Sequence, residues 1–146
     1  MELNGETLRF IREHCKDDVR SLALQAPKYP GVDMPVALTQ IAGRQAAAEK
    51  IPSWHEEEGV LYPRHLSLEQ CSSEATARYK ASIIPESSSG TLTDLTGGFG
   101  IDCAFLSPKF HHVTYVERQE VLCEIASHNF PLLGLNHIQI ENKDGI

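Results

Sequence analysis

The spacing of apolar residues along the chain predicts two parts of different structure. In the first part, apolar residues recur every three or four positions, which is typical of amphipathic helices. This spacing predicts helices near residues 4–13, 19–25, 35–50 and 66–84, with a loop or irregular extended segment over residues 51–63. We therefore divide the chain into a helical subdomain over residues 1–65 and a second unit over residues 66–146.

The second part switches from helical spacing to strand alternation. Residues 86–90 are small and polar and predict a flexible joint, after which residues 91–95 alternate as a strand. Three glycines interrupt the pattern before helical spacing returns at Ile101. Residues 112–117 and 137–141 then predict two further strands, separated by a helix over residues 119–133. Strands that alternate with helices predict an α/β fold, with a parallel sheet in the order 3-2-1 and right-handed crossovers.

The glycine turn between the first strand and its helix is the candidate binding element. Glycine allows positive φ and a close approach of the backbone to a ligand, while the free N–H groups of the new helix face that ligand. The next strand ends in Glu117, whose carboxylate is suited to accept both hydroxyls of a ribose. The pattern therefore predicts a nucleotide site at the turn.

The spacing of acid and glycines indicates which nucleotide is bound. A dinucleotide fingerprint needs a third glycine where this chain has Cys103. Asp94, three further residues and then Gly98-Phe99-Gly100 resemble motif I of the class I S-adenosylmethionine-dependent methyltransferases. The resemblance implies a Rossmann-like fold, with S-adenosylmethionine as the cofactor. It also implies roles for residues of the turn and of three strand ends: Asp94 for the amino-acid end, the backbone of Thr96, Gly97, Gly98, Phe99 and Gly100 along the cofactor, Glu117 for the ribose and Asp144 for the adenine.

A second resemblance concerns residues 66–81. They are similar to the helix before the first strand in bacterial methyltransferases with a helical N-terminal part, including Bacteroidetes proteins that carry a ferredoxin-like and THUMP-like C-terminal part. Gln70, Ser72 and Ser73 then become candidate cofactor contacts, although simple helix capping explains them equally well. This resemblance implies an RNA acceptor, bound through a C-terminal part that this chain lacks.

The family's catalytic motif, an Asn or Asp followed by prolines and an aromatic residue, does not occur in the sequence. We therefore expect the chain to be the N-terminal portion of a longer enzyme, with a truncated cofactor domain and no activity alone. The outer edge of the strand at residues 91–95 would then lack a partner and could pair with a second copy of the chain. A simple turn aspartate remains an alternative for Asp144.

Composition argues against three kinds of binding: general nucleic-acid binding, membrane insertion and metal binding. The chain has 146 residues and a net charge of −7, so it has no general basic surface for nucleic acid. No apolar run is long enough to span a bilayer, and we expect a cytoplasmic protein with no membrane contact. The four cysteines are far apart and lack metal-ligand spacing, and His55 beside three glutamates on a loop has no convergent geometry, so we expect no metal.

Two other functions remain open. An NAD-binding oxidoreductase would use the same strand, turn and ribose acid, although it would favour the third glycine and a fingerprint near the N-terminus. A helical interaction module with a degenerate nucleotide fold would bind neither cofactor.

Overall fold

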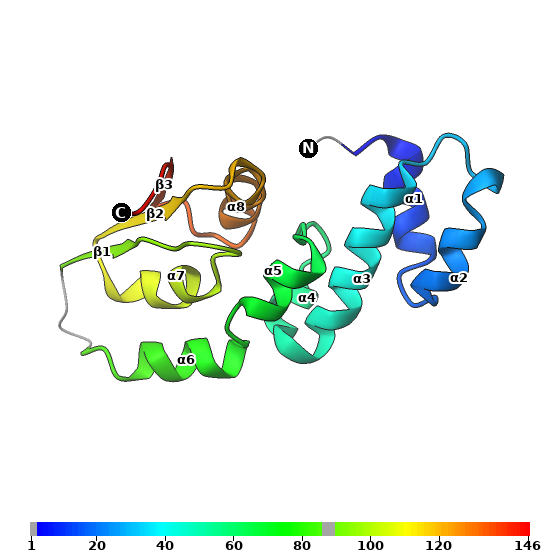
Figure 1. Ribbon diagram of the computed structural model, residues 1–146. Coiled ribbons are helices and arrows are strands. Elements are labelled where there is room, and N and C mark those ends of the chain that lie inside the picture. Colours follow the sequence, from blue (N-terminus) through cyan, green and yellow to red (C-terminus); the bar gives the residue numbers. More distant parts are fainter. Residues whose placement is uncertain (1–2, 86–89) are drawn as a thin grey trace.

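The computed structural model describes residues 3–85 and 90–146 and shows a helical part beside a small parallel sheet (Figure 1). The helical elements are α1 (Gly5–Glu13), α2 (Val19–Leu24), η1 (Ala26–Lys28), α3 (Met34–Lys50), α4 (Pro52–His55), α5 (His65–Gln70) and α6 (Glu74–Ser82). The α/β elements are β1 (Thr91–Asp94), α7 (Ile101–Leu106), η2 (Ser107–Lys109), β2 (His112–Glu117), α8 (Glu120–Leu132) and β3 (Ile138–Asn142). The helical first part and the parallel sheet predicted from the sequence are both confirmed; of the joint predicted at residues 86–90, only Gly90 lies within the described residues.

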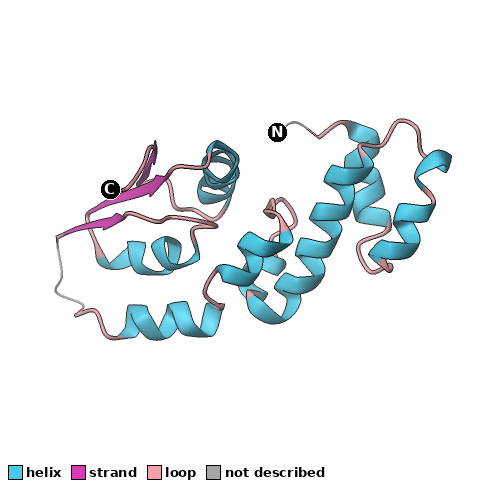
Figure 2. Cartoon of the chain, in the orientation of Figure 1, coloured by secondary structure: helices cyan, strands magenta, loops and turns pink. Residues whose placement is uncertain are grey.

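The sheet is parallel throughout and has the order β1-β2-β3, which is the predicted order counted from the other edge. Val113 in β2 lies between Leu92 of β1 and Ile138 of β3. Figure 2 shows the strands together at one end of the molecule, with helices on the connections between them. Because the strands are parallel, the ends of β1 and β2 that carry Asp94 and Glu117 lie at the same edge of the sheet.

Two predicted segments differ from the structure. The stretch predicted as loop over residues 51–63 contains the short helix α4, which begins at Pro52. Proline suits the first turn of a helix, because the N–H that it lacks would have no partner there. The helix predicted over residues 66–84 is two helices, because the chain is extended at Cys71 and Ser73. The side chain of Ser73 then accepts a hydrogen bond from the N–H of Thr76 and caps α6.

The buried apolar side chains form two clusters that meet within α3. Its first half packs with α1 and α2 through Phe10, Leu22 and Ile41. Its last turn, at Ala47, belongs to a second cluster that includes Trp54 of α4 and Tyr115 of β2. Helix α3 therefore contributes side chains to both clusters.

The segment at residues 60–62 belongs to the second cluster and is held by two buried side-chain amides. Gln40 accepts from the N–H of Tyr62 (2.8 Å) and donates to its carbonyl (2.9 Å). Asn129 of α8 makes the same pair of bonds with Leu61, each of 2.8 Å. The backbone polar groups of two residues without a strand partner are thus satisfied.

Cys103 and Cys123 are buried and all four cysteines are free thiols. Burial raises the pKa of Cys103 to about 12, so this thiol stays protonated at neutral pH. Within residues 3–85 and 90–146, no helix is long and apolar enough to cross a membrane, and no cluster of His, Cys, Asp and Glu could hold a metal ion.

Candidate functional site

A pocket of about 350 Å³ opens where β1 and β2 end. Nine of the residues predicted as cofactor contacts line it: Gln70, Ser72, Asp94, Thr96, Gly97, Gly98, Phe99, Gly100 and Glu117. Its other lining residues are Ser67, Cys71, Ile101, Asp102, Gln119 and Leu122. The pocket therefore lies between the glycine turn, the end of β2 and the segment that joins α5 to α6.

The glycine turn follows β1 directly and has the backbone conformation that the sequence indicated. Gly98 has φ of 56° and Gly100 has φ of 91°, both in the region that favours glycine. The N–H of Gly97 donates to the carbonyl of Val116 (2.8 Å), and the N–H of Gly100 donates to the carbonyl of Gly97 (2.9 Å). The turn is thus fixed both to itself and to the neighbouring strand.

The three glycines of the turn are needed for different reasons. A Cβ on Gly97 would collide with the ring of Tyr115, and one on Gly100 would lie 2.7 Å from Cζ of Phe130. These two positions let the turn pack onto the core. At Gly98, by contrast, a Cβ would have only the carbonyl oxygen of Thr96 nearby, at 3.7 Å. Gly98 therefore presents bare main chain to the pocket.

Glu117 connects the end of β2 to this turn. Its Oε1 accepts from the N–H of Gly98 (3.1 Å), and its Oε2 accepts from the N–H of Gln119 (2.7 Å). The side-chain amide of Asn142, at the end of β3, donates to the carbonyl of Glu117 (2.9 Å). A carboxylate has about four acceptor positions, so two remain for a ligand such as a ribose diol.

Asp94 lies at the other side of the turn. Its Oδ1 accepts from the N–H of Thr96 (3.1 Å), which is the local turn typical of aspartate. Burial raises the pKa of Asp94; the hydrogen bond from Thr96 opposes this effect, and the negative charge of Asp102 adds to it. Asp94 is therefore a carboxylate whose charge the protein itself does not fully stabilise.

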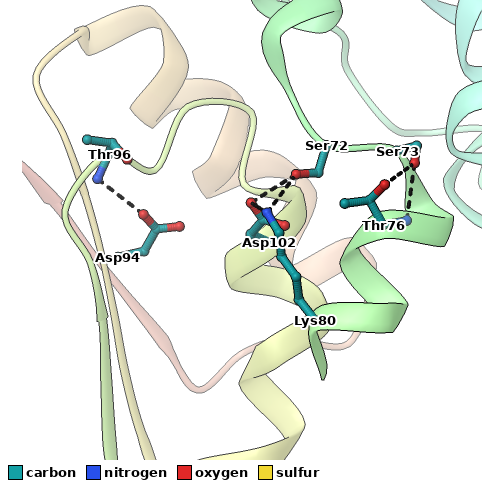
Figure 3. A network of polar contacts seen from close by, with 7 residues as sticks. All are labelled: Ser72, Ser73, Thr76, Lys80, Asp94, Thr96 and Asp102. Carbon is teal, nitrogen blue, oxygen red and sulfur yellow. Dashed lines mark hydrogen bonds and ion pairs between the residues drawn. The ribbon is translucent and has the colours of Figure 1, made fainter. Parts of the chain in front are cut away.

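Across the pocket from Asp94, three side chains form a polar network that the sequence did not predict. Asp102, in the first turn of α7, accepts from the hydroxyl of Ser72 and from the ammonium of Lys80, each at 3.0 Å (Figure 3). Lys80 also donates to the hydroxyl of Ser72 (3.2 Å). At the end of α3, Lys50 donates to the carbonyls of Leu68 and Glu69 and so holds the end of α5, where Gln70 enters the pocket.

Two predicted contact residues lie outside the pocket lining. Ser73 caps α6, as described above. Asp144 is exposed in the turn after β3, where its Oδ1 accepts from the N–H of Ile146 (3.1 Å). Ser72, which the sequence offered together with Ser73, is the one of the two serines that reaches the pocket.

Comparison with solved structures gives a match over almost the whole chain. A crystal structure described as that of a "putative methyltransferase" from Porphyromonas gingivalis superposes with a TM-score of 0.73 at 29% sequence identity. The match covers 95% of this chain and 34% of the other, so our chain spans about a third of the length of that protein. The chain therefore has a methyltransferase-like fold.

A second solved structure, of an rRNA methylase from Streptococcus thermophilus, has a TM-score of 0.41 at 21% identity over 48% of this chain and 41% of that one. A match this weak carries no argument. No protein-family model and no curated protein matches the chain.

Proposed function

We propose that this chain is the cofactor-binding portion of an S-adenosylmethionine-dependent methyltransferase. The main support for the proposal is the pocket at the ends of β1 and β2. There β1 ends at Asp94, the chain turns at Gly98 and Gly100 with positive φ, and the carboxylate of Glu117 accepts from the N–H of Gly98. The fold shared with the Porphyromonas protein supports the same class of reaction.

Each wall of the pocket has a part in this proposal. The adenosine would lie along the bare main chain at Gly98, with its ribose hydroxyls on the open acceptor positions of Glu117. Asp94 and Gln70 would orient the amino-acid end of the cofactor. Asp144 and Ser73 lie outside the pocket lining, so they would contact the cofactor only after a movement of the backbone around them. The bound cofactor would supply the sulfonium methyl group, and the protein's own part would be to position it and to exclude water.

Titration calorimetry with S-adenosylmethionine, S-adenosylhomocysteine and NAD tests the proposal. We expect heat with the first two ligands and none with NAD, because Cys103, where the dinucleotide fingerprint has its third glycine, is buried in α7. Binding of NAD alone would instead support the oxidoreductase. No heat with any of the three ligands would favour the non-enzymatic interaction module.

RNA is our proposed acceptor, on the basis of the resemblance to enzymes with a THUMP-like part. The test needs the longer protein that we expect to contain the catalytic motif. Transfer of a labelled methyl group to RNA, and not to protein, would support the proposal. Labelled protein without labelled RNA would contradict it.

We also propose that a second copy of the chain can pair with β1. Among the described residues, β1 has a strand partner only in β2, so the backbone groups of its other edge are open to another strand. Light scattering at high protein concentration should then give the mass of a dimer, and a monomer at all concentrations would contradict this pairing.

A further inference from the structure

Residues 70–72, at the end of α5, contribute three side chains to the pocket lining. The chain is extended at Cys71, so the last carbonyls of α5 are not followed by another helical turn. Carbonyls at such a helix end need hydrogen-bond donors from elsewhere in the protein. The position of this side of the pocket therefore depends on the groups that hold the end of α5.

Lys50, the last residue of α3, supplies these donors, and α5 lies beside α3 (Figure 1). Its ammonium donates to the carbonyl of Leu68 (2.7 Å) and to that of Glu69 (2.9 Å). Burial raises the pKa of the Cys71 thiol, and both the charge of Lys50 and a hydrogen bond from it oppose this effect. The ammonium therefore contacts both the backbone of α5 and a side chain of the pocket lining.

The helix that follows Lys50 supports the other side of the pocket. Trp54 of α4 packs edge to face against Phe99, with the two ring centroids 5.2 Å apart. Phe99 belongs to the glycine turn and lines the pocket. The end of α3 and the helix α4 therefore contact the pocket-forming residues at two places, the end of α5 and the turn.

We infer that Lys50 is a positioning residue for the proposed cofactor pocket, because it fixes the pocket-lining residues 70–72 to the end of α3. This inference rests on the proposed function and adds to it a role for α3, which contributes no residue to the pocket lining. Lys50 acts through the backbone of α5 and the thiol of Cys71. Without its ammonium, a ligand must itself order residues 70–72, and this ordering lowers the affinity.

Lys50→Met tests the inference, because methionine keeps an unbranched apolar stem and removes the ammonium. Gln45→Met is the matched control, because Gln45 of the same helix also donates to two backbone carbonyls, those of Cys15 (3.2 Å) and Asp17 (2.8 Å). None of these three residues lines the pocket. Lys50→Arg is the conservative variant, since arginine keeps the charge and the donors. Calorimetry with S-adenosylhomocysteine measures affinity, and urea unfolding measures stability.

We expect Lys50→Met to bind S-adenosylhomocysteine about tenfold more weakly, because the ligand must order residues 70–72. Gln45→Met should bind within about twofold of the original chain, although its urea midpoint falls to a similar extent, because each variant loses two hydrogen bonds to carbonyls. Lys50→Arg should bind within about threefold of the original, since the donors are restored. The emission of Trp54, the single tryptophan, should be the same in Lys50→Met as in the original, because its contact with Phe99 is unchanged.

Unchanged affinity in Lys50→Met, or an equal loss in Gln45→Met, would overturn the assignment while leaving the proposed function intact. Binding by Lys50→Arg as weak as that of Lys50→Met would do the same. A shifted Trp54 emission or a failure of Lys50→Met to fold would also overturn it, since Lys50 would then serve the fold in general. If the unaltered chain did not bind S-adenosylhomocysteine, the proposed function would fail and the assignment with it.

Discussion

The two walls of the pocket are built in different ways. One, which we call the turn wall, consists of residues 94–100 with Glu117, and its structure depends mainly on backbone hydrogen bonds. The other, which we call the helix wall, consists of Ser72 and Asp102, which line the pocket, together with Lys80, which donates to both across α6 and α7. The turn wall is made by one short stretch of chain and one strand end, whereas the helix wall is assembled from three separate elements.

This difference predicts different consequences of substitution. In the proposed function the turn wall contacts the parts of the ligand that every adenosine compound shares, so its loss should affect all of them equally. The helix wall is held by contacts among its own side chains, so its loss should mainly change the packing of α6 against α7. Substitutions in the two walls should therefore be separable by measuring ligand affinity and the free energy of unfolding side by side.

The largest effect is expected for Gly98→Val in the turn wall. Valine cannot adopt φ of 56° without strain, and its side chain would occupy the open space along the main chain. All adenosine ligands should lose at least about a hundredfold in affinity, because both the space and the N–H to Glu117 are disturbed.

Gly134→Val is the matched control for this substitution. Gly134 follows α8 with φ of 78°, and nothing lies within 4 Å of a Cβ built there. It should be strained to a similar degree and yet bind normally. If both variants lost binding to the same extent, general destabilisation and not the turn wall would be the cause.

A smaller effect is expected for Glu117→Gln. Glutamine keeps one acceptor but loses the charge that receives the two backbone N–H groups, so the turn and the ribose contact both weaken. Affinity should fall by about tenfold or more for S-adenosylmethionine, S-adenosylhomocysteine and 5′-methylthioadenosine alike. Calorimetry can use Glu141→Gln as the control, because Glu141 of β3 pairs with Lys143 just beyond the strand and neither residue lines the pocket. A loss restricted to ligands with an ammonium group would contradict the ribose assignment.

The contrast between the walls also explains what could be predicted from the sequence. Strand, turn and helix in the turn wall are consecutive, and Gly98 and Gly100 have the positive φ that the glycine pattern indicated. Asp102 belongs to the same stretch, but its role depends on Ser72 and Lys80, which lie 30 and 22 residues away. A sequence pattern gives local geometry and contains no signal for such a contact.

The same limit applies to the fold. Amphipathic spacing predicted the long helices, because each pattern extends over many residues. The alternation of strands with helices predicted the parallel order of the sheet, through the rule of right-handed crossovers. The break between α5 and α6 and the four-residue helix α4 are too short to produce a period. The hydrogen bonds made by the buried amides of Gln40 and Asn129 could not be predicted either. Their partners at residues 61 and 62 lie far away in the sequence, and no local pattern indicates the pairing.

Asp94→Asn in the turn wall should raise the stability of the fold at neutral pH and lower the affinity for the ligand. The pKa of Asp94 is raised chiefly by burial, so its ionised form costs folding free energy at neutral pH, and this cost disappears as the pH falls through the folded pKa. The variant should therefore melt at a higher temperature than the original chain at pH 7, and the difference should shrink at acid pH. Its affinity for S-adenosylmethionine should nevertheless fall. Lower stability at pH 7 would contradict the cost assigned to the charge, and thermal melts over a pH series provide the measurement.

The smallest effect is expected for Lys80→Met in the helix wall, measured as stability. The ion pair with Asp102 is partly exposed, with 45% of the lysine and 35% of the aspartate side chain accessible, so solvent screens it. Urea unfolding should show a loss of at most about 1 kcal/mol, and a double-mutant cycle with Asp102→Asn should give a coupling energy of the same size. A coupling above about 2 kcal/mol would mean that the pair is a main structural link between α6 and α7. The helix wall would then contribute to folding to an extent that its partly exposed ion pair alone does not explain.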